Sequence, residues 1–596
     1  MKKIVIGVAI IGMVMCKVYS QQEVYLSAER VVITPERYET NLKDLPLSVS
    51  VINRKDIELI NKFQTTDLLD LLPGVFIMKT SAFGRADVNI RGIGNNGRQL
   101  GILIDGRPDK MSLMGCSVTH TLPLNNIERI EVIRGPESVV YGSEAFGGVV
   151  NIITRRASKN LEIVLDLYGG SFNTWISRLQ VGRNLNKVSY MFSVDKRDSD
   201  GHTENSSYKA TDFGGNFNYL FNDGSQISLS GKYFDGLKYE PLPAVVGTWN
   251  DYKRGSVDLN YKKDFSFVSL DGKYYRSFGE HKFSDGWNSQ DYTDGVVVNG
   301  RTNLSGSNIL SYGIDYRYLW GKVLGGAPLI FRKEYTKYEY GIYLNDKHTF
   351  FDKVILDGGV RYNYDEYAKE VITSRFGVVY KAFLNTTVRG VYSQGFRPPH
   401  LNDLFLYASA NPSLKPEKVN NIEFGVRQKL FASLYFDITT FNMQGENLIQ
   451  VVSGKKQNSG SFNFDGIETI MNFNIVKGFS GSVSYSYLDS KNTVVAQPKN
   501  RVVAMLNFEI SRANALLTNE YVSDYYYPVS GGKKKLNDYN LLNLKISCEV
   551  VKNLTVYGTI DNITDEEYRI YSEVPSASGV YLMPGRTVGV GVKYLF

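Results

Sequence analysis

The side chains best suited to bind a metal complex gather in one short segment. Residues 110–120 read KMSLMGCSVTH and contain Met111, Met114, Cys116 and His120. Thioether, thiolate and imidazole groups are soft ligands, which suit copper or the axial position of a haem iron. The alternative is that Met and Cys fill gaps in a compact loop. The segment therefore indicates either a soft-metal site or a tightly packed turn.

A second candidate site is made of oxygen ligands. Asp195, Asp198, Asp200 and Glu204 lie close together in the sequence, and clustered carboxylates of this kind can bind calcium. The alternative is a solvated acidic loop. Further along, residues 524–527 read DYYY. Such an aromatic run either grips a planar chelate or, as we favour, lies at a membrane interface.

Several classes of function are disfavoured. The sequence has no nucleophile–base motif, no metal-ligand signature and no Gly-rich phosphate loop followed by a helix, which argues against an enzyme. The 68 basic and 61 acidic residues give a net charge of +7, and without a clustered basic face this does not indicate nucleic-acid binding. Three Cys residues exclude a disulfide scaffold.

The N-terminal residues predict export. Lys2 and Lys3 precede an apolar run over residues 4–15, and Ser20 is a small residue at a plausible cleavage point. This is the pattern of a secretory signal peptide over residues 1–20. Lipidation at Cys16 is the alternative, but Met15 is bulky where a small residue is expected.

Residues 40–156 have the texture of a small α+β domain. Short apolar runs alternate with turn-forming pairs such as Arg91-Gly92 and Asp105-Gly106. A helix is expected over residues 66–72, capped by Thr65 or Thr66 and stopped by Pro73-Gly74. Strands are expected over residues 48–52, 75–78, 88–90, 100–104 and 130–133.

From residue 157 onward, apolar and polar residues alternate with a period of two. In the last ten residues, for example, Val588, Val590 and Val592 alternate with Thr587, Gly589 and Gly591. Alternation over about ten residues is typical of a membrane-spanning β-strand. About 22 such segments fit between residues 157 and 596, at roughly 20 residues per strand and connection. The sequence therefore predicts a 22-stranded antiparallel transmembrane β-barrel.

The predicted connections alternate in length. Short turns are expected at residues 184–187, 222–225, 262–265, 380–383 and 551–553, and long links at residues 197–208, 235–252, 395–418, 442–461, 523–539 and 564–585. Short inner turns alternating with long outer loops are what an outer-membrane barrel requires. His202, His281 and His400 then fall on outer loops, and His348 on an inner turn.

Motifs along nearly the whole mature chain resemble those of TonB-dependent outer-membrane receptors. The segment Glu29, Arg30, Val31, Val32, Ile33 and Thr34 resembles the TonB box, which couples such receptors to an energy source. Two further pairs of segments resemble motifs of the barrel. Residues 395–399 and 411–417 resemble a surface loop of the family, and residues 561–565 and 584–596 resemble its closing strands. Four short segments resemble the plug-domain motifs: Arg91-Gly92, Asp105-Gly106, Arg134-Gly135-Pro136 and Tyr141-Gly142. The last two lie within the run IEVIRGPESVVYGSEAFGGVVNIIT, which is highly specific.

This resemblance implies an organisation: signal peptide 1–20, tether 21–39 with the TonB box, plug domain 40–156 inside the lumen, and barrel 157–596. It implies TonB-driven import of a scarce bulky chelate, a ferric siderophore or a cobalamin-type corrinoid, across the bacterial outer membrane. A haem receptor or a copper-complex receptor is the alternative. A surface signalling receptor is disfavoured, because no room for a folded extension precedes the box.

Partners and site residues follow from the same resemblance. The partners are the TonB complex of the inner membrane, outer-membrane lipid and the small-molecule chelate, with a surface lipoprotein as a further candidate; no resident cofactor is required. Arg91 and Arg134 are expected to pair with barrel carboxylates, because they are charges inside a polar lumen. Substrate contacts are expected from the plug apex and the outer loops, at Met111, Met114, Cys116, His120, Phe396, Arg397 and His400.

Overall fold

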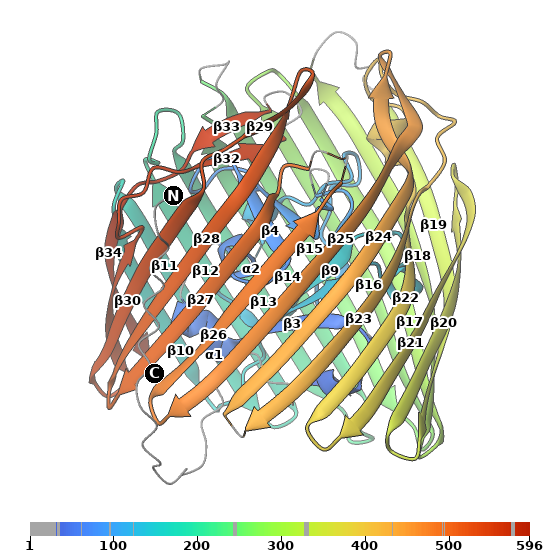
Figure 1. Cartoon of the computed structure of the whole chain (residues 1–596), viewed down its shortest axis with the longest axis horizontal. Helices are drawn as coiled ribbons and strands as arrows, with labels where there is room; N and C mark the ends of the chain where they lie inside the picture. Colours follow the sequence, from blue (N-terminus) through green and yellow to red (C-terminus); the bar gives the residue numbers. More distant parts are fainter. Residues whose placement is uncertain are drawn as a thin grey trace.

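Twenty-two antiparallel strands close into a barrel around the plug domain, which precedes them in the chain (Figure 1). The computed structural model describes residues 31–32, 36–60, 62–94, 97–122, 124–241, 247–326, 333–431, 433–491, 493, 495–573 and 578–596.

The wall consists of long strands, several of which exceed the length needed to cross a bilayer. Their bounds are β10 (Glu162–Gly170), β11 (Thr174–Leu185), β12 (Val188–Ser199), β13 (Tyr208–Leu220), β14 (Gln226–Tyr239), β15 (Trp249–Asp264), β16 (Val268–Phe283), β17 (Asn288–Ser305), β18 (Asn308–Gly325), β19 (Glu334–Phe350), β20 (Val354–Asp365), β21 (Lys369–Phe383), β22 (Thr386–Arg397), β23 (Glu417–Phe431), β24 (Leu434–Val452), β25 (Lys455–Val476), β26 (Phe479–Asp489), β27 (Pro498–Ile510), β28 (Ala513–Val529), β30 (Tyr539–Val551), β31 (Leu554–Asp561) and β34 (Thr587–Leu595).

Alternating side chains give the wall two different surfaces. In β11, Arg178 and Gln180 are buried toward the lumen, whereas Trp175 and Leu179 point outward and are 62% and 41% exposed. Exposed large apolar side chains recur on strands all around the barrel. A spanning strand needs this arrangement, because hydrocarbon surrounds the outside and polar protein fills the inside.

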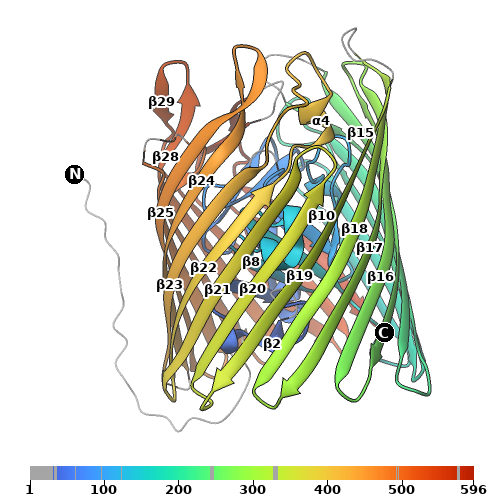
Figure 2. The same ribbon diagram turned by 90° about the vertical axis from the view of Figure 1, so that its right-hand side faces the viewer.

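The barrel closes where β34 pairs with both β10 and β31. The backbone N–H of Phe596 donates to the carbonyl of Ile163 at 2.8 Å, so this end of the chain lies beside the start of β10. The connections at this edge of the barrel are short, and the longer connections, such as the one between β22 and β23, extend from the opposite edge (Figure 2). That opposite edge also has short turns, between β10 and β11 and between β20 and β21, so the predicted rhythm of short and long connections is present only in part.

Two of the predicted long loops are instead hairpins of continuing strand. β24 and β25 pair almost to their tips across the two-residue turn Ser453-Gly454, where both residues have positive φ. The link after β28 folds back as β29 (Gly532–Lys535), which pairs with β28. The sequence missed these extensions because both faces of a strand are wet beyond the hydrocarbon, so the apolar–polar alternation stops while pairing continues.

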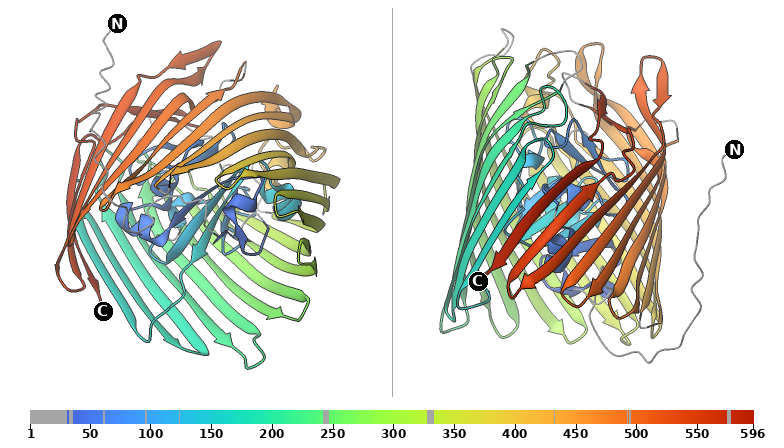
Figure 3. Two further views of the ribbon diagram at one scale, coloured as in Figure 1. Left: turned by 60° about the horizontal axis from the view of Figure 1, so that its bottom comes forward. Right: turned by 90° about the vertical axis from the view of Figure 1, so that its left-hand side faces the viewer.

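The plug lies inside the lumen (Figure 3). Its main sheet has the order β3 (Ser48–Asn53), β8 (Ile127–Arg134), β9 (Gly148–Thr154), β6 (Gly101–Ile104) and β7 (Arg107–Pro108), with β6 parallel to β9. A separate hairpin pairs β4 (Val75–Lys79) with β5 (Ala86–Ile90). The helices are α1 (Arg54–Ile60), α2 (Thr65–Leu69) and α3 (Ser138–Tyr141).

The plug has its own apolar core, which continues into the wall. Ile77, Val88, Ile102 and Val150 are fully buried in one cluster that also contains Phe464 of β25. All five predicted plug strands are present. The predicted helix begins at Thr65, with Gln64 as its N-cap and no side-chain capping bond, so the prediction of a threonine cap is wrong. Among the described residues, no helix is long and apolar enough to cross a membrane.

Candidate functional site

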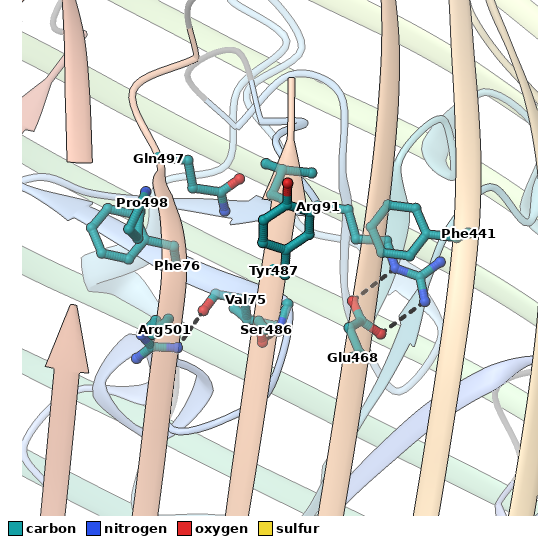
Figure 4. Close-up of a pocket in the computed structure, with 12 residues that line it drawn as sticks. Val75, Phe76, Arg91, Phe441, Glu468, Ser486, Tyr487, Gln497, Pro498 and Arg501 are labelled. Carbon is teal, nitrogen blue, oxygen red and sulfur yellow. Dashed lines mark hydrogen bonds and ion pairs between the residues drawn. The ribbon is translucent and has the colours of Figure 1, made fainter. Parts of the chain in front are cut away.

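Two plug arginines and two wall glutamates form a buried group, the plug–wall charge cluster: Arg91, Arg134, Glu423 and Glu468. Arg91 donates through Nε and Nη2 to both carboxylate oxygens of Glu468, at 2.8 and 2.9 Å (Figure 4). Its Nη1 donates to Glu423 at 2.9 Å, and Arg134 Nε lies 2.9 Å from Glu468. The predicted pairing of both arginines with barrel carboxylates is confirmed. Because the group is buried, removing one partner leaves an uncompensated charge, which costs about 3–5 kcal/mol.

The other plug motifs build backbone turns. Asp105 and Gly106 have φ values of 48° and 80° and join β6 to β7. The Asp105 carboxylate accepts the N–H and the hydroxyl of Thr154 at 2.9 and 2.7 Å, which ties this turn to the end of β9. At Gly142 a Cβ would lie 2.8 Å from the Arg361 guanidinium. The predicted plug residues Gly135, Pro136 and Tyr141 lie between the end of β8 and the end of α3.

The segment over residues 110–116 packs against the outer part of the wall. Within the plug, Lys110 forms an ion pair with Glu144 at 2.8 Å. Toward the wall, the hydroxyl of Ser112 lies 2.6 Å from that of Thr293 in β17. Met111 is buried, and its Sδ atom lies 3.8 Å from Cys116 Sγ. The sulfur atoms therefore close a compact turn.

His120 lies in a separate aromatic cluster. Its ring centroid is 5.8 Å from that of Phe234 and 4.8 Å from that of Tyr252, both edge-to-face. Burial, together with the positive charges of Lys238 and Arg197, holds the pKa of His120 well below its ordinary value. The imidazole is therefore neutral and packed as an aromatic ring.

The predicted soft-metal residues are thus divided between two places. Met111 and Cys116 form one pair, His120 is elsewhere, and only Met114 and Cys116 are half-buried rather than buried. In the part of the chain that the structure describes, no group of three or more His, Cys, Asp or Glu side chains is placed to hold a metal ion. Substrate contact by these residues stays a prediction.

The predicted outer-loop residues organise the connection between β22 and β23. Arg397 donates to Glu417 at 2.6 Å and to Asp403 at 3.2 Å. His400 precedes the short helix α4 (Leu401–Leu404) and exchanges capping hydrogen bonds with Asp403. Phe396, Arg397 and His400 are all buried. In this conformation they fix the loop, and their contact with substrate also stays a prediction. Of the other histidines, His281 lies within β16 and His348 within β19, so the predicted positions on an outer loop and on an inner turn are both wrong.

The four carboxylates of the predicted calcium cluster also lie in different surroundings. Asp195 is buried in β12 and forms ion pairs with Arg178 at 2.9 Å and with Arg197 at 3.0 Å. Asp198 is 3.8 Å from Lys209, and Asp200 and Glu204 are exposed. Asp195 therefore already has its partners, and calcium binding by the remaining carboxylates stays a prediction.

The tyrosine run after Asp524 holds the outer region onto the plug. Tyr525 is fully buried, with its ring 5.3 Å from that of plug residue Phe76. Its hydroxyl donates to the carbonyl of Tyr571 at 3.3 Å, and Tyr527 stacks on Tyr571 at 5.2 Å. Tyr571 belongs to β32 (Arg569–Ser572), which pairs with β33 (Gly579–Leu582). The expected membrane-interface position is wrong for Tyr525, because the alternation of β28 points it inward.

A chamber of about 220 Å³, the outer chamber, lies between the plug and the upper wall. Its plug side includes Gly92, directly after Arg91 of the plug–wall charge cluster, and a smaller cavity of about 30 Å³ adjoins that cluster (Figure 4). Its described lining is Met78, Asn89, Gly92, Ile93, Gly94, Gln99, Glu417, Leu448, Ile449, Gln450, Ser461, Phe462, Phe464, Thr493, Val495, Ala496, Gln497 and Glu573.

The sequence analysis missed this chamber apart from Gly92. Its lining comes from the plug, from β23, β24 and β25, from the link before β27 and from the end of β32. Hydrophobic periodicity gives no signal for such a surface, because each segment contributes only a few side chains. The pair of glycines at Gly92 and Gly94, directly after Arg91, was the one local indication of a close approach.

The coupling segment is partly described. Val31–Val32 forms β1, which pairs antiparallel with β2 (Thr40–Asn41); Glu29, Arg30, Ile33 and Thr34 lie outside the described residues. Just beyond, the Arg37 guanidinium lies over the rings of Tyr141 and Tyr343, at 4.8 and 5.7 Å. One side chain therefore touches both plug and wall next to the coupling segment.

Comparisons with known proteins place this architecture. The family model described as "TonB dependent receptor-like, beta-barrel" matches residues 180–563, and that of the "TonB-dependent Receptor Plug Domain" matches residues 41–149. Two similar relatives are vitamin B12 transporters BtuB. The one from Photobacterium profundum is 24% identical over 95% of this chain and 96% of its own length, and the one from Vibrio vulnificus is 24% identical over the full length of both.

Solved structures agree in fold. The siderophore receptor PirA from Acinetobacter baumannii has a TM-score of 0.79 at 18% identity, with 92% of this chain and 98% of that chain covered. The ferripyoverdine receptor of Pseudomonas aeruginosa has a TM-score of 0.80 at 12% identity, with coverage of 95% and 89%. Identities this low carry the fold alone.

A closed barrel filled by an N-terminal plug defines a class of outer-membrane proteins that take up ligands. The chain belongs to the TonB-dependent receptor family, and it is a protein of the outer membrane.

Proposed function

We propose that this protein imports a bulky chelate of the corrinoid or ferric-siderophore class, with energy supplied through TonB. The observation that carries the proposal is the position of the outer chamber. Gly92 and Ile93 line it, and Arg91, one residue earlier, holds the plug to Glu423 and Glu468. A ligand in the chamber would touch the segment that carries a buried ion pair between plug and wall.

The relatives support the same class of cargo. Two relatives in sequence are named vitamin B12 transporters, and the similar structures include receptors for siderophores. A chamber of about 220 Å³ is smaller than a typical site for a whole drug-sized ligand. It would hold one face or edge of such a chelate, with the outer loops covering the rest.

Coupling is assigned to the segment around β1. An extended strand with a free edge can accept a strand from a partner by β-addition, and Arg37 links this region to both plug and wall. A pull on β1 would therefore reach the plug through residues 36–41.

The test separates binding from transport. Val32→Pro removes the backbone donor that strand pairing needs, and Val32→Ala is the matched control that keeps it. We expect Val32→Pro to abolish uptake of labelled cyanocobalamin or ferric siderophore by cells that lack other receptors for it, and to leave binding to purified protein within about two-fold. Unchanged uptake would show that the coupling assignment is wrong. Failure of the purified protein to bind any corrinoid or ferric siderophore would overturn the proposed cargo.

A further inference from the structure

The outer chamber has an unbalanced charge. Its described lining includes two carboxylates, Glu417 and Glu573, and neither Lys nor Arg. The residues that adjoin this lining in the sequence are all uncharged. They are Asn95, Asn96, Asn492, Val494, Val574, Pro575, Ser576 and Ala577. Arg98, the basic residue beside Gln99, donates through Nε to the Met114 carbonyl at 3.0 Å.

The two carboxylates differ in their surroundings. Glu417 accepts hydrogen bonds from Arg397 Nε at 2.6 Å, from Gln99 Nε2 at 2.9 Å and from the backbone N–H of Ile449 at 2.9 Å. The positive charge of Arg397 therefore balances the negative charge of Glu417. Glu573 forms no ion pair with any described side chain. Burial, with the nearby charge of Asp87, raises the pKa of Glu573 above its ordinary value. Glu573 is therefore the unbalanced charge of the chamber.

The rest of the lining is amide and apolar. Asn89, Gln99, Gln450 and Gln497 supply amide groups, and Gln497 Oε1 is buried with no hydrogen-bond partner among the described residues. The rings of Phe462 and Phe464 stack with centroids 4.3 Å apart and contribute apolar atoms to the lining. An amide oxygen without a partner costs free energy that a ligand N–H can recover.

From these features we infer that the chamber selects its ligand by charge: it takes a neutral or cationic face edged with amide groups and rejects an anionic one. The inference rests on the proposed function and adds the ligand class. An anion brought beside Glu573 would lose its hydration and meet a like charge, without a described cation in the lining to offset either cost. A neutral ligand with peripheral amides could instead pair with the glutamine side chains and contact the apolar atoms of Phe462 and Phe464 in the lining.

The experiment uses ligands matched in shape and different in charge. Purified full-length protein in detergent is titrated with cyanocobalamin and with its monocarboxylate, in which one peripheral amide is replaced by a carboxylate. A second pair is a neutral ferric hydroxamate and a triply anionic ferric catecholate. In whichever class binds, we expect the neutral member to bind at least about ten-fold more tightly.

Variants locate the effect. Glu573→Gln keeps the shape and removes the charge, and should raise the affinity for the anionic member about ten-fold relative to its neutral partner. Glu567→Gln is the matched control, because Glu567 is a 72% exposed carboxylate outside the chamber lining, and it should leave the ratio unchanged. Gln497→Leu should weaken the amide-bearing ligands.

The outcomes separate the two proposals. Preferential binding of the anionic member, or a charge preference that Glu573→Gln does not alter, overturns the charge selection, whereas TonB-dependent uptake of that ligand would leave the proposed import intact. Binding of none of the probes contradicts both.

Discussion

Single buried residues at the contact between plug and wall determine how firmly the plug is held in the barrel. Glu468 forms ion pairs with both Arg91 and Arg134, so Glu468→Gln should weaken plug attachment by about 3–5 kcal/mol. The expected result is a lower melting temperature of the plug and leakage of bulky antibiotics into cells. Asp465→Asn is the control on the same strand, because Asp465 is half-exposed and pairs with Lys491 at the surface. Equal effects of the two variants would mean that burial of the cluster does not matter.

The buried histidine should make the plug sensitive to acid. The pKa of His120 is lowered in the folded protein, while an unfolded histidine titrates near pH 6.5. Unfolding therefore takes up a proton below that value, so the stability is fully present above about pH 6.5 and is lost as the pH falls. We expect the melting temperature to drop between pH 7.5 and 5.0, and His120→Phe to reduce that drop. An identical pH dependence in the variant would assign the effect to other groups.

The soft residues show why a site is harder to predict from sequence than a charge pair. Arg91 and Arg134 had to find carboxylates, because a buried charge without a partner is too costly. Met111, Cys116 and His120 carry no such requirement, and the sequence left both of their roles open. Their burial depends on wall residues such as Phe234 and Tyr252, whose positions no local pattern fixes.

Among the elements, the strands were predictable where lipid demands alternation. β34 carries outward apolar side chains at every second position and β11 at most of its outward positions, and that pattern identified the barrel. The outer ends of β24, β25 and β28 lie where water bathes both faces, and there the prediction of loops was wrong. The outer chamber takes part of its lining from the outer ends of β24 and β25, so alternation could not reveal that part of the site either.

The link between the plug and β17 gives an element-scale prediction. The hydroxyls of Ser112 and Thr293 lie 2.6 Å apart, a separation suited to a disulfide after replacement of both residues by Cys. We expect the oxidised Ser112→Cys/Thr293→Cys protein to bind ligand normally but to lose uptake, because the plug can no longer move away from the wall there. Reduction should restore uptake. Ser112→Cys alone is the control under the same oxidant, and full uptake by the oxidised double variant would confine the motion to the chamber side of the plug.

At the scale of the whole molecule, the plug is what keeps the barrel shut. A 22-stranded barrel encloses a wide lumen, and the described residues 36–154 of the plug fill it (Figure 3). Deletion of residues 40–154 should therefore leave a folded barrel with large, long-lived conductance steps in planar bilayers, where the full protein gives none. A barrel without the plug that fails to conduct would show that the outer hairpins alone can close it.

The seam between β34 and β10 has a consequence for how the protein is made. These two strands pair with each other in space but lie at opposite ends of the barrel segment in the sequence. The edge of β10 therefore stays unpaired until almost the whole chain has been synthesised and exported. An open strand edge invites pairing with other chains. Biogenesis therefore has to shelter the edge of β10 until β34 is available to pair with it. Errors in assembly should accordingly begin at this seam.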